Sequence, residues 1–443
     1  MLQRKITDFL IRWKSEKDSE CLVIKGARQV GKTYIVEKFG RDYYDSFFEL
    51  NFIFHPELIK VFDESLEVDD ITRRMSAHFP GMEFLPGRTL IFLDEIQKCP
   101  NARTALKTFA LDNRYDVIAS GSLLGLHYGQ DPDLDEEISS VPVGYERQIT
   151  LHSLDFEEFL WAMGISKDTV SDIRGYFERL EPVPDDLHNL FSRYLREYIV
   201  TGGMPAVVKC LADTGNFSKV HEAQEAILNA YSDDILRHAR TTDKPKIRKC
   251  FNSIPVQLAK ENKKFQYSVV EPRGTARKFG NSVQWLEDAG IVNICSNVRT
   301  PEFPLIAYRM EDYFKIYFHD TGLLVAMFGF EMKQAILSKS LAGPMKGGIY
   351  ENLIADMLIK SGYQLYYYKP DENNQELEFL ISRGGKIIPI EVKSKRGETI
   401  SLNAYIAHYS PETAYKFIDG NIGKSGSKIT LPHYMACFID AFT

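Results

Sequence analysis

Two glycines, a lysine and a threonine near the start of the chain have the types and spacing of a loop that holds phosphate groups. An apolar, strand-like run at residues 21–24 precedes them and a helix-compatible segment at residues 34–39 follows, which is the context that such a loop requires. The glycines allow a tight turn whose backbone N–H groups point inward at an anion. The whole stretch reads Gly26, Ala27, Arg28, Gln29, Val30, Gly31, Lys32 and Thr33.

These eight residues, called the phosphate loop below, form a candidate ATP-binding site. Lys32 is expected to reach the β- and γ-phosphates, which makes it a candidate catalytic residue, and the Thr33 hydroxyl is expected to ligate Mg²⁺. The partial positive charge of the following helix N-terminus adds to the attraction for phosphate. A chance Gly-rich turn is the alternative, and the flanking strand and helix argue against it.

Two adjacent carboxylates, Asp94 and Glu95, follow an apolar run at residues 90–93. Such a run is typical of a strand buried in a parallel sheet. Asp94 is then placed to hold Mg²⁺ through its water shell, and Glu95 to orient and polarise the water that attacks the γ-phosphate. A buried strand with a polar cap is the alternative, and the phosphate loop upstream favours the metal site.

A further strand-like run, at residues 115–122, ends in small polar residues that include Ser120 and Ser122. Ligands of open α/β sheets bind at the carboxyl ends of the strands, so either serine is a candidate sensor of the γ-phosphate or of the water. A strand-end turn is the alternative. Arg147, which begins the last expected strand of this region, is a candidate for stabilising transition-state charge or an ordinary surface residue.

These motifs resemble the Walker A, Walker B and sensor elements of AAA-type ATPases, at residues 26–33, 90–95 and 120–122. Two further phrases, at residues 154–160 and 202–205, are similar to a large prokaryotic family. In that family such an ATPase is fused to a C-terminal domain of unknown function, and the resemblance runs along nearly the whole chain. It implies a sheet of strand order 5-1-4-3-2 followed by a helical lid. Family members usually have Gly-Arg where this chain has Gly-Tyr-Glu-Arg, ending at Arg147, so the role of that arginine stays open.

Basic residues gather after the expected lid. Between residues 240 and 278 there are eleven Lys and Arg against three acidic residues, in a chain of net charge −7. Apolar residues at helical spacing mark one helix at residues 247–258 and a second at 279–286, and residues 291–295 begin a hairpin. This order predicts a winged helix-turn-helix, with DNA as its partner or, alternatively, a protein. The solvent face of the second helix is expected to carry Arg277, Lys278, Asn281 and Gln284, types that contact phosphates and base edges.

The C-terminal part holds a second group of carboxylates. Glu391 and Lys393 share one face of an expected strand, and Glu378 lies on the strand before it. Two carboxylates and a lysine can hold Mg²⁺ and stabilise an activated water for phosphodiester cleavage. The pattern, with Glu351 on a preceding helix as a further acid, resembles the PD-(D/E)XK nuclease fold. Glu378 stands where that fold more often has Asp, and a surface ion pair is the alternative.

The expected fold class is α/β, in four parts. They are an AAA-type ATP-binding core (1–151), a helical lid (152–240), a winged helix with a connecting segment (241–342) and a nuclease-like domain (343–443). A Gly-rich run at residues 343–348 reads as the last boundary. We expect a Mg²⁺-dependent ATPase coupled to DNA binding and DNA cleavage. One alternative is an ATP-switched signalling or scaffold protein with an inactive nuclease-like domain, and another is a nuclease whose ATPase gates access.

Bulk composition excludes several classes of protein. The 443 residues are 44% hydrophobic and 26% charged, as in ordinary globular proteins. No apolar run approaches the roughly 20 residues needed to span a bilayer, so no membrane partner is expected and the cytoplasm is the expected location. The six cysteines lack the spacing of a zinc site. The oligomeric state stays open, a homo-oligomer included.

Overall fold

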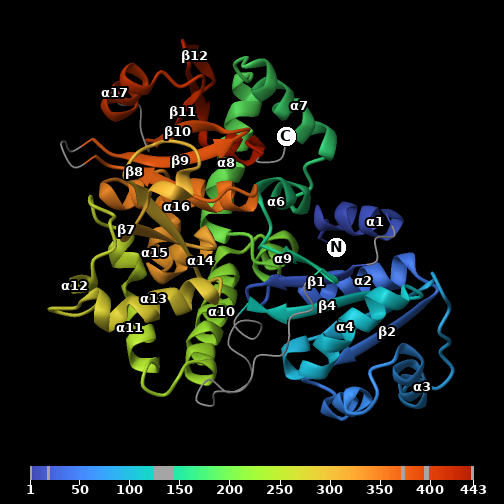
Figure 1. The fold of residues 1–443 in the computed structure, drawn as a ribbon. Helices are drawn as coiled ribbons and strands as arrows, with labels where there is room; N and C mark the ends of the chain where they lie inside the picture. The colour runs from blue at the N-terminus through green and yellow to red at the C-terminus, as the bar shows by residue number, and fades with distance from the viewer. Residues whose placement is uncertain (1, 17–19, 124–143, 371–374, 394–398, 441–443) are drawn as a thin grey trace.

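Two β-sheets lie on opposite sides of a band of helices (Figure 1). The computed structural model describes residues 2–16, 20–123, 144–370, 375–393 and 399–440. The sheet from the N-terminal part of the chain is at the lower right of Figure 1, and the sheet from the C-terminal part is at the upper left. None of the helices within these ranges is long and apolar enough to cross a membrane.

The N-terminal part is a five-stranded sheet with helices on both faces. Its elements are α1 (Ile6–Glu16), β1 (Cys21–Gly26), α2 (Lys32–Tyr43), β2 (Ser46–Asn51), η1 (Pro56–Phe62), α3 (Val68–His78), β3 (Thr89–Asp94), η2 (Ile96–Lys98), α4 (Pro100–Asp112), β4 (Asp116–Ser122) and β5 (Glu146–Thr150). All pairings are parallel, in the order β2-β3-β4-β1-β5, which confirms the expected order 5-1-4-3-2. Because side chains alternate between faces, Leu22 packs with α1 and α2 whereas Val23 packs with α3 and α4.

The stretch expected as a helical lid, residues 152–240, is helical. It contains α6 (Phe156–Ala162), α7 (Lys167–Arg179), α8 (Asp185–Thr201), α9 (Pro205–Thr214) and α10 (Phe217–His238). A reciprocal cap starts α6, because the Asp155 carboxylate accepts from the Glu158 backbone N–H while the Glu158 carboxylate accepts from the Asp155 N–H. Pro205 starts α9, at a position where a missing N–H costs nothing.

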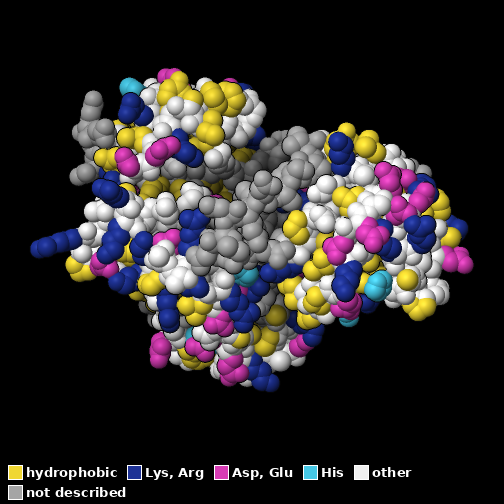
Figure 2. Space-filling view, turned by 60° about the horizontal axis from the view of Figure 1, so that its bottom comes forward, with side chains coloured by type: hydrophobic (Ala, Val, Ile, Leu, Met, Phe, Trp, Pro, Cys, Tyr) yellow, Lys and Arg dark blue, Asp and Glu magenta, His cyan; other side chains and the backbone are white. Residues whose placement is uncertain are grey.

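Three helices and a hairpin follow. They are α11 (Lys244–Leu258), α12 (Tyr267–Val270), α13 (Ala276–Asp288), β6 (Val292–Val298), η3 (Leu305–Tyr308) and β7 (Arg309–Phe318). Of these, α11 and α13 correspond to the two expected helices, with the short α12 between them. The apolar positions that predicted the helices, such as Phe251 and Phe279, are buried. Lys and Arg side chains lie across the left face in Figure 2, where these helices are. Two short helices, α14 (Thr321–Met327) and α15 (Phe330–Leu337), lead to the C-terminal part.

The hairpin does not stand alone, because it joins the C-terminal sheet. The remaining elements are α16 (Pro344–Lys360), β8 (Tyr366–Tyr368), β9 (Leu377–Arg383), β10 (Lys386–Val392), α17 (Ile400–Tyr409), β11 (Ala414–Ile418), β12 (Gly423–Ser425), β13 (Lys428–Pro432) and η4 (His433–Phe438). The sheet has the order β12-β13-β11-β10-β9-β8-β6-β7. Ser296 of β6 is in register with Tyr366 of β8, in a parallel pairing. The hairpin and the C-terminal strands therefore share one sheet.

The Gly-rich run at residues 343–348, where the last domain boundary was expected, is mostly helical, and the boundary itself stays a prediction. The helix α16 begins at Pro344. A Cβ atom on Gly348 would lie 2.1 Å from the Leu258 carbonyl oxygen. Glycine at this position is therefore a requirement of close packing between α16 and the end of α11, rather than a sign of a turn.

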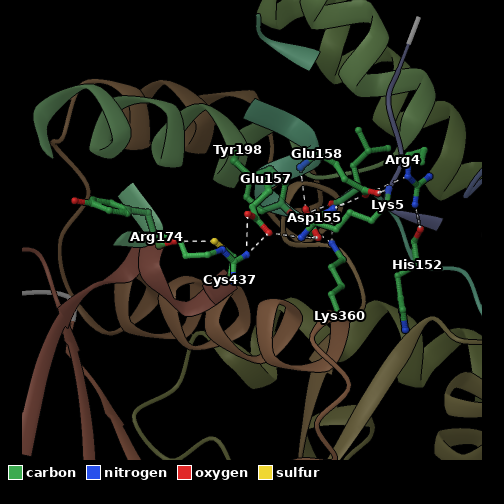
Figure 3. A network of polar contacts seen from close by, with 12 residues as sticks. Arg4, Lys5, His152, Asp155, Glu157, Glu158, Arg174, Tyr198, Lys360 and Cys437 are labelled. Atoms are coloured by element: carbon green, nitrogen blue, oxygen red, sulfur yellow. Dashed lines mark hydrogen bonds and ion pairs between the residues drawn. The ribbon is translucent and has the colours of Figure 1, made fainter. Parts of the chain in front are cut away.

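Charged side chains from distant parts of the chain meet in the interior around α6 (Figure 3). The Lys5 ammonium pairs with Asp155 at 2.6 Å and also with Glu157, and the Arg174 guanidinium of α7 pairs with Glu157 at 3.0 Å. On the other side, Lys360 of α16 donates to the Leu154 carbonyl at 3.1 Å and to the Tyr198 hydroxyl at 3.0 Å. This set of contacts, called the polar junction below, joins the N-terminus, the lid and the C-terminal part.

A buried aspartate extends the polar junction toward β7. Asp320 accepts hydrogen bonds from the Ser153 hydroxyl at 3.0 Å and from the Gly203 N–H at 2.7 Å. A Cβ atom on Gly202 would lie 1.9 Å from a carboxylate oxygen of Asp320. The family-like phrases at residues 154–160 and 202–205 are therefore neighbours in space, brought together by this carboxylate.

The polar junction predicts a specific pH dependence of stability. Asp356 pairs with Lys360 at 3.0 Å, and burial raises the pKa of its carboxyl to about 7. Because this folded-state pKa lies above the unfolded value of about 3.9, its contribution to stability is present at low pH and is lost as the pH rises from about 4 to about 7. In the wild type, the free energy of unfolding should therefore fall by on the order of 3 kcal/mol between pH 4.5 and 8. Asp356→Asn should remove this fall, and urea denaturation across the pH range measures it.

Asp45→Asn is the matched control, because Asp45 is exposed and pairs with Arg88 at 2.9 Å on the surface. Its pH profile should follow that of the wild type. An Asp356→Asn profile as steep as the wild-type profile would contradict the assignment.

Candidate functional site

The phosphate loop connects β1 to α2, and each of its glycines meets a structural requirement. Gly31 has a φ of +92°, a left-handed conformation that favours glycine. A Cβ atom on Gly26 would lie 2.3 Å from the Leu151 carbonyl oxygen. Gln29 also has a positive φ, of 64°. The loop is therefore wound tightly against the start of the lid, as the spacing of its glycines predicts.

Lys32 begins α2 and its side chain folds back into the phosphate loop. Its Nζ donates to the carbonyl oxygens of Gly26 at 3.1 Å and Ala27 at 3.0 Å. Burial lowers the pKa of this ammonium, and the nearby carboxylates of Glu95 and Asp94 oppose that shift. The structure thus brings the predicted lysine and the two predicted carboxylates to one place.

Asp94 is the centre of a hydrogen-bond network at the carboxyl end of the sheet. Its Oδ2 accepts from the Thr33 hydroxyl at 2.9 Å and from the Asn51 side-chain amide at 2.8 Å. Its Oδ1 accepts from the Ser120 hydroxyl. Asp94 is 1% exposed, so these donors satisfy a carboxylate that is otherwise cut off from water.

The sequence interpretation anticipated three of these four residues and missed Asn51. A signal was present, because Asn51 is a polar residue at the carboxyl end of β2, the position that identified Ser120 on β4. Asn51 also accepts from the backbone N–H of Ile53 at 3.1 Å and of Phe54 at 3.0 Å. Its side chain therefore holds both Asp94 and the turn after β2.

Glu95 lies next to this network in an unusual backbone conformation. Its φ of 57° and ψ of 46° are left-handed, which is rare and costly for a residue with a side chain. The carboxylate accepts from the Gln97 side-chain amide at 2.5 Å. A backbone conformation of this kind persists only where surrounding contacts stabilise it. The chain turns at Glu95, so this residue lies at the phosphate-loop end of the sheet instead of continuing the strand.

A mainly apolar cavity opens beside the phosphate loop. It has a volume of about 480 Å³ and is lined by Leu2, Gly31, Tyr34, Trp161 and Pro205, among others. The Trp161 indole N–H is buried and has no hydrogen-bond partner among the described residues. Cavities of about 300–1,000 Å³ with few polar groups are typical of small-molecule sites. The sequence did not indicate this cavity, because its lining comes from four separate segments.

The lid contacts the phosphate loop directly. The Arg28 guanidinium forms an ion pair with Asp234 of α10, and the Tyr231 hydroxyl, one turn earlier, lies 3.1 Å from the His319 ring nitrogen Nε2. Arg147 instead lies against α1, 3.6 Å from the Glu16 carboxylate and with its guanidinium over the Phe9 ring. In the described contacts it is therefore Arg28, and not Arg147, that links the phosphate loop to the lid.

The four predicted residues of the C-terminal part also come together. Lys393 Nζ lies 2.8 Å from Glu391 Oε1 and 3.4 Å from Glu378 Oε1. Burial, followed by the charge of Glu351, raises the pKa of Glu378 to about 7. One carboxylate oxygen of Glu391 is buried without a hydrogen-bond partner. Among the described residues, no group of three or more His, Cys, Asp and Glu side chains is arranged to hold a metal ion.

Two lysines that the sequence did not single out face this cluster, one of them half-buried and the other buried. Lys263 pairs with Glu351 at 2.7 Å, and Lys315 of β7 pairs with Glu376 at 2.5 Å and lies 3.9 Å from Glu351. Both come from the segment expected to form the winged helix. The cluster therefore lies between that segment and the C-terminal strands, which no single stretch of sequence indicates.

The Asp94 network predicts a stability effect at Asn51. Asn51→Ala removes one donor from a buried carboxylate and two turn hydrogen bonds, so the free energy of unfolding should fall by about 1–3 kcal/mol. Urea denaturation measures the change. Asn189→Ala, at an exposed position of α8, is the matched control and should stay within about 0.5 kcal/mol of the wild type. Equal effects of the two substitutions would show that Asn51 does not support Asp94.

Three parts of the chain match protein-family models. Residues 18–160 match the AAA domain. Residues 192–334 match a domain of unknown function (DUF8612), and residues 346–429 match another domain of unknown function (DUF4143). No curated protein matches the chain. The match to the AAA domain includes the whole phosphate loop together with Asp94, Glu95 and Ser120.

Solved structures resemble the chain at low identity. The alignment with the Walker-type ATPase PABY2304 of Pyrococcus abyssi has 12% identity and a TM-score of 0.43, and covers 74% of this chain and 96% of that one. The RuvB Holliday junction branch migration motor of Thermotoga maritima and AMPPCP-bound DnaA of Aquifex aeolicus each have 13% identity and a TM-score of 0.29. They cover 68% and 64% of this chain, and 90% and 88% of their own. Independently of these alignments, residues 18–160 match the AAA domain.

Proposed function

We propose that the AAA domain binds ATP together with Mg²⁺ and hydrolyses it. The observation that carries the proposal is the hydrogen bond from the Thr33 hydroxyl to Asp94, 2.9 Å long, at the mouth of the phosphate loop. It places a hydroxyl and a carboxylate side by side, and such oxygen donors are the ligands that Mg²⁺ prefers. The residues present therefore fit the metal, which when bound would neutralise charge on the β- and γ-phosphates.

The residues around the loop have separate tasks in this proposal. The loop N–H groups and the N-terminus of α2 bind the phosphates, and Lys32 exchanges its carbonyl partners in the loop for phosphate oxygens. Glu95 orients and polarises the attacking water, with its position set by the left-handed backbone. The Ser120 hydroxyl donates to Asp94 and holds this carboxylate in place, so that Ser120 can sense the γ-phosphate or the attacking water.

The apolar cavity beside Gly31 is the proposed site of the adenine base. Its volume of about 480 Å³ suits a base and ribose, and Pro205 and Tyr34 offer flat apolar surfaces. The Trp161 ring also lines this cavity and offers a further aromatic surface to the base.

Nucleotide state is proposed to reach the rest of the chain through α10. The Arg28–Asp234 ion pair ties this helix to the phosphate loop, and α10 leads within a few residues into α11. A shift of the loop would therefore act on the basic helices. This coupling is compatible with both an ATP-driven enzyme and an ATP-switched signalling or scaffold protein.

Two substitutions test the ATP site. Lys32→Ala should abolish tight ATP binding in calorimetry, because the phosphates lose their principal cation. Glu95→Gln should retain ATP binding but slow hydrolysis by about a hundredfold or more, because the amide cannot polarise the water. Near-wild-type affinity in Lys32→Ala would contradict the phosphate-loop assignment, and unchanged turnover in Glu95→Gln would remove Glu95 from the mechanism.

A second proposal concerns nucleic acid. The four polar side chains expected on the solvent face of α13 are all exposed: Arg277, Lys278, Asn281 and Gln284. This supports DNA contact, although Lys278 also pairs with Glu271. Cleavage of the bound DNA by the C-terminal part is supported by the convergence of Glu378, Glu391 and Lys393. DNA-stimulated ATP turnover would favour this proposal over the scaffold alternative.

Metal-dependent plasmid cleavage tests the C-terminal site. The wild-type chain should nick plasmid with Mg²⁺ or Mn²⁺, and Lys393→Ala should lower the rate by about a hundredfold, because the lysine would stabilise the activated water. Lys386→Ala is the matched control, since Lys386 is on the same strand but exposed and paired with Glu412. Equal cleavage by the wild type and Lys393→Ala would place any activity in another site or a contaminant.

A further inference from the structure

A small cavity lies between the lid and the C-terminal sheet, far along the chain from the phosphate loop. It has a volume of about 130 Å³. One wall is α8, a second is the segment from α15 to α16, and a third is formed by the ends of β11 and β13. In Figure 1, α8 runs beside α16 and below β11. The AAA domain contributes no residue to the cavity.

The charge of the lining is strongly positive. Arg196 of α8, Lys339 after α15 and Lys346 of α16 line the cavity, against one carboxylate, Asp419. None of the three cationic side chains has an ion pair or a side-chain hydrogen bond among the described residues, and Lys346 lies only over the Tyr350 ring. Like charges around one cavity repel each other, and an anion bound among the three cations would replace this repulsion with attraction.

The floor of the cavity is polar and well packed. The His188 ring nitrogen Nδ1 lies 3.0 Å from the Tyr434 hydroxyl, and the His433 ring packs against Tyr350 with centroids 4.5 Å apart. His433 is 3% exposed and donates through Nε2 to the Lys393 carbonyl oxygen at 3.1 Å. A neutral imidazole has one N–H, and that of His433 is used in this bond, so the cationic side chains rather than the floor would hold an anion.

We propose that this cavity, called the cationic pocket, binds a phosphate group of a nucleotide or of a nucleic-acid strand end. Arg and Lys side chains that converge from three elements suit a multiply charged oxyanion. The volume admits a phosphate group but not a whole nucleotide, since cavities that enclose drug-sized ligands begin near about 300 Å³. The rest of the ligand would therefore extend from the opening of the pocket.

A phosphate bound in the cationic pocket would connect two parts of the chain. Arg196 belongs to the lid, Lys346 begins the C-terminal part, and the phosphate would bridge them. The floor residue His433 contacts the backbone of Lys393, which carries the proposed cleavage site. Binding would therefore stabilise the lid against the C-terminal sheet and hold Lys393 in position. The pocket itself does not depend on the proposed ATPase or nuclease activity.

The test uses the full chain carrying Lys32→Ala, so that the phosphate loop contributes little to binding. Inorganic phosphate and AMP are titrated by calorimetry at constant ionic strength. Arg196→Gln and Lys346→Gln, each added to this chain, should weaken the binding by about tenfold or more, because each removes a charge-assisted hydrogen bond. Thermal unfolding checks that both variants are folded, and if one is not, the other decides.

Arg193→Gln is the matched control. It lies three residues before Arg196 on the same helix, its side chain is 55% exposed and 3.7 Å from Glu197, and it does not line the pocket. Its affinity for phosphate should equal that of the parent chain. An equal loss of affinity in Arg193→Gln would overturn the proposal. If the parent chain binds neither phosphate nor AMP, the proposal stands only if the pocket binds the strand end described next.

The source of the phosphate is distinguished with oligonucleotides. A 5′-phosphorylated strand is compared with the 5′-hydroxyl strand of the same sequence, again in the Lys32→Ala chain. A preference for the phosphorylated strand that disappears in Arg196→Gln assigns the pocket to strand ends. Binding of AMP without such a preference assigns it to free nucleotides. If neither AMP, phosphate nor the strand end depends on Arg196 and Lys346, the proposal is wrong.

Discussion

The fold depends on a group of charges that cannot be left unpaired in the interior. Glu157 and Glu158 of α6 are buried, and their cationic partners come from other elements. Lys5 of the N-terminus pairs with Glu157 and with Asp155, Arg4 pairs with Glu158, and Arg174 of α7 pairs with Glu157. Lys360 of α16 donates to the Leu154 carbonyl beside them. Removing one partner from a buried pair costs about 3–5 kcal/mol, because the remaining charge is uncompensated. The AAA domain, the lid and the C-terminal part therefore dock against one another through one shared set of charged groups, the polar junction.

The same segment of chain also shapes the nucleotide site. The Leu151 carbonyl lies where a Cβ atom of Gly26 would be, and the Leu154 carbonyl lies where a Cβ atom of Gly203 would be. Residues 151–158 thus contact the phosphate loop at one end and the buried carboxylates at the other. A movement of the loop would have to be absorbed within this short segment or transmitted through it, together with the Arg28–Asp234 pair.

Local motifs were sufficient to predict the phosphate loop and the place of Asp94 and Glu95 at the end of a strand, because each depends on backbone chemistry within a few residues. The order of the parallel strands came instead from the family resemblance, since strand order is not a local property. The helices and hairpin after the lid were also predictable, since their apolar spacing is local. Trp161 and Lys315 were not, because their roles depend on which distant segments surround them. The packing role of Gly348 against the end of α11 was not predictable either, because it depends on a distant segment.

The pairing of β6 with β8 constrains how this chain can evolve. The two segments that match separate domains of unknown function, residues 192–334 and 346–429, contribute strands to one sheet. A recombination event between them would leave both halves with an open strand edge, which promotes aggregation. Selection should therefore keep the two segments together as one heritable unit. The segment that matches the AAA domain contributes no described strand to that sheet and is freer to diverge.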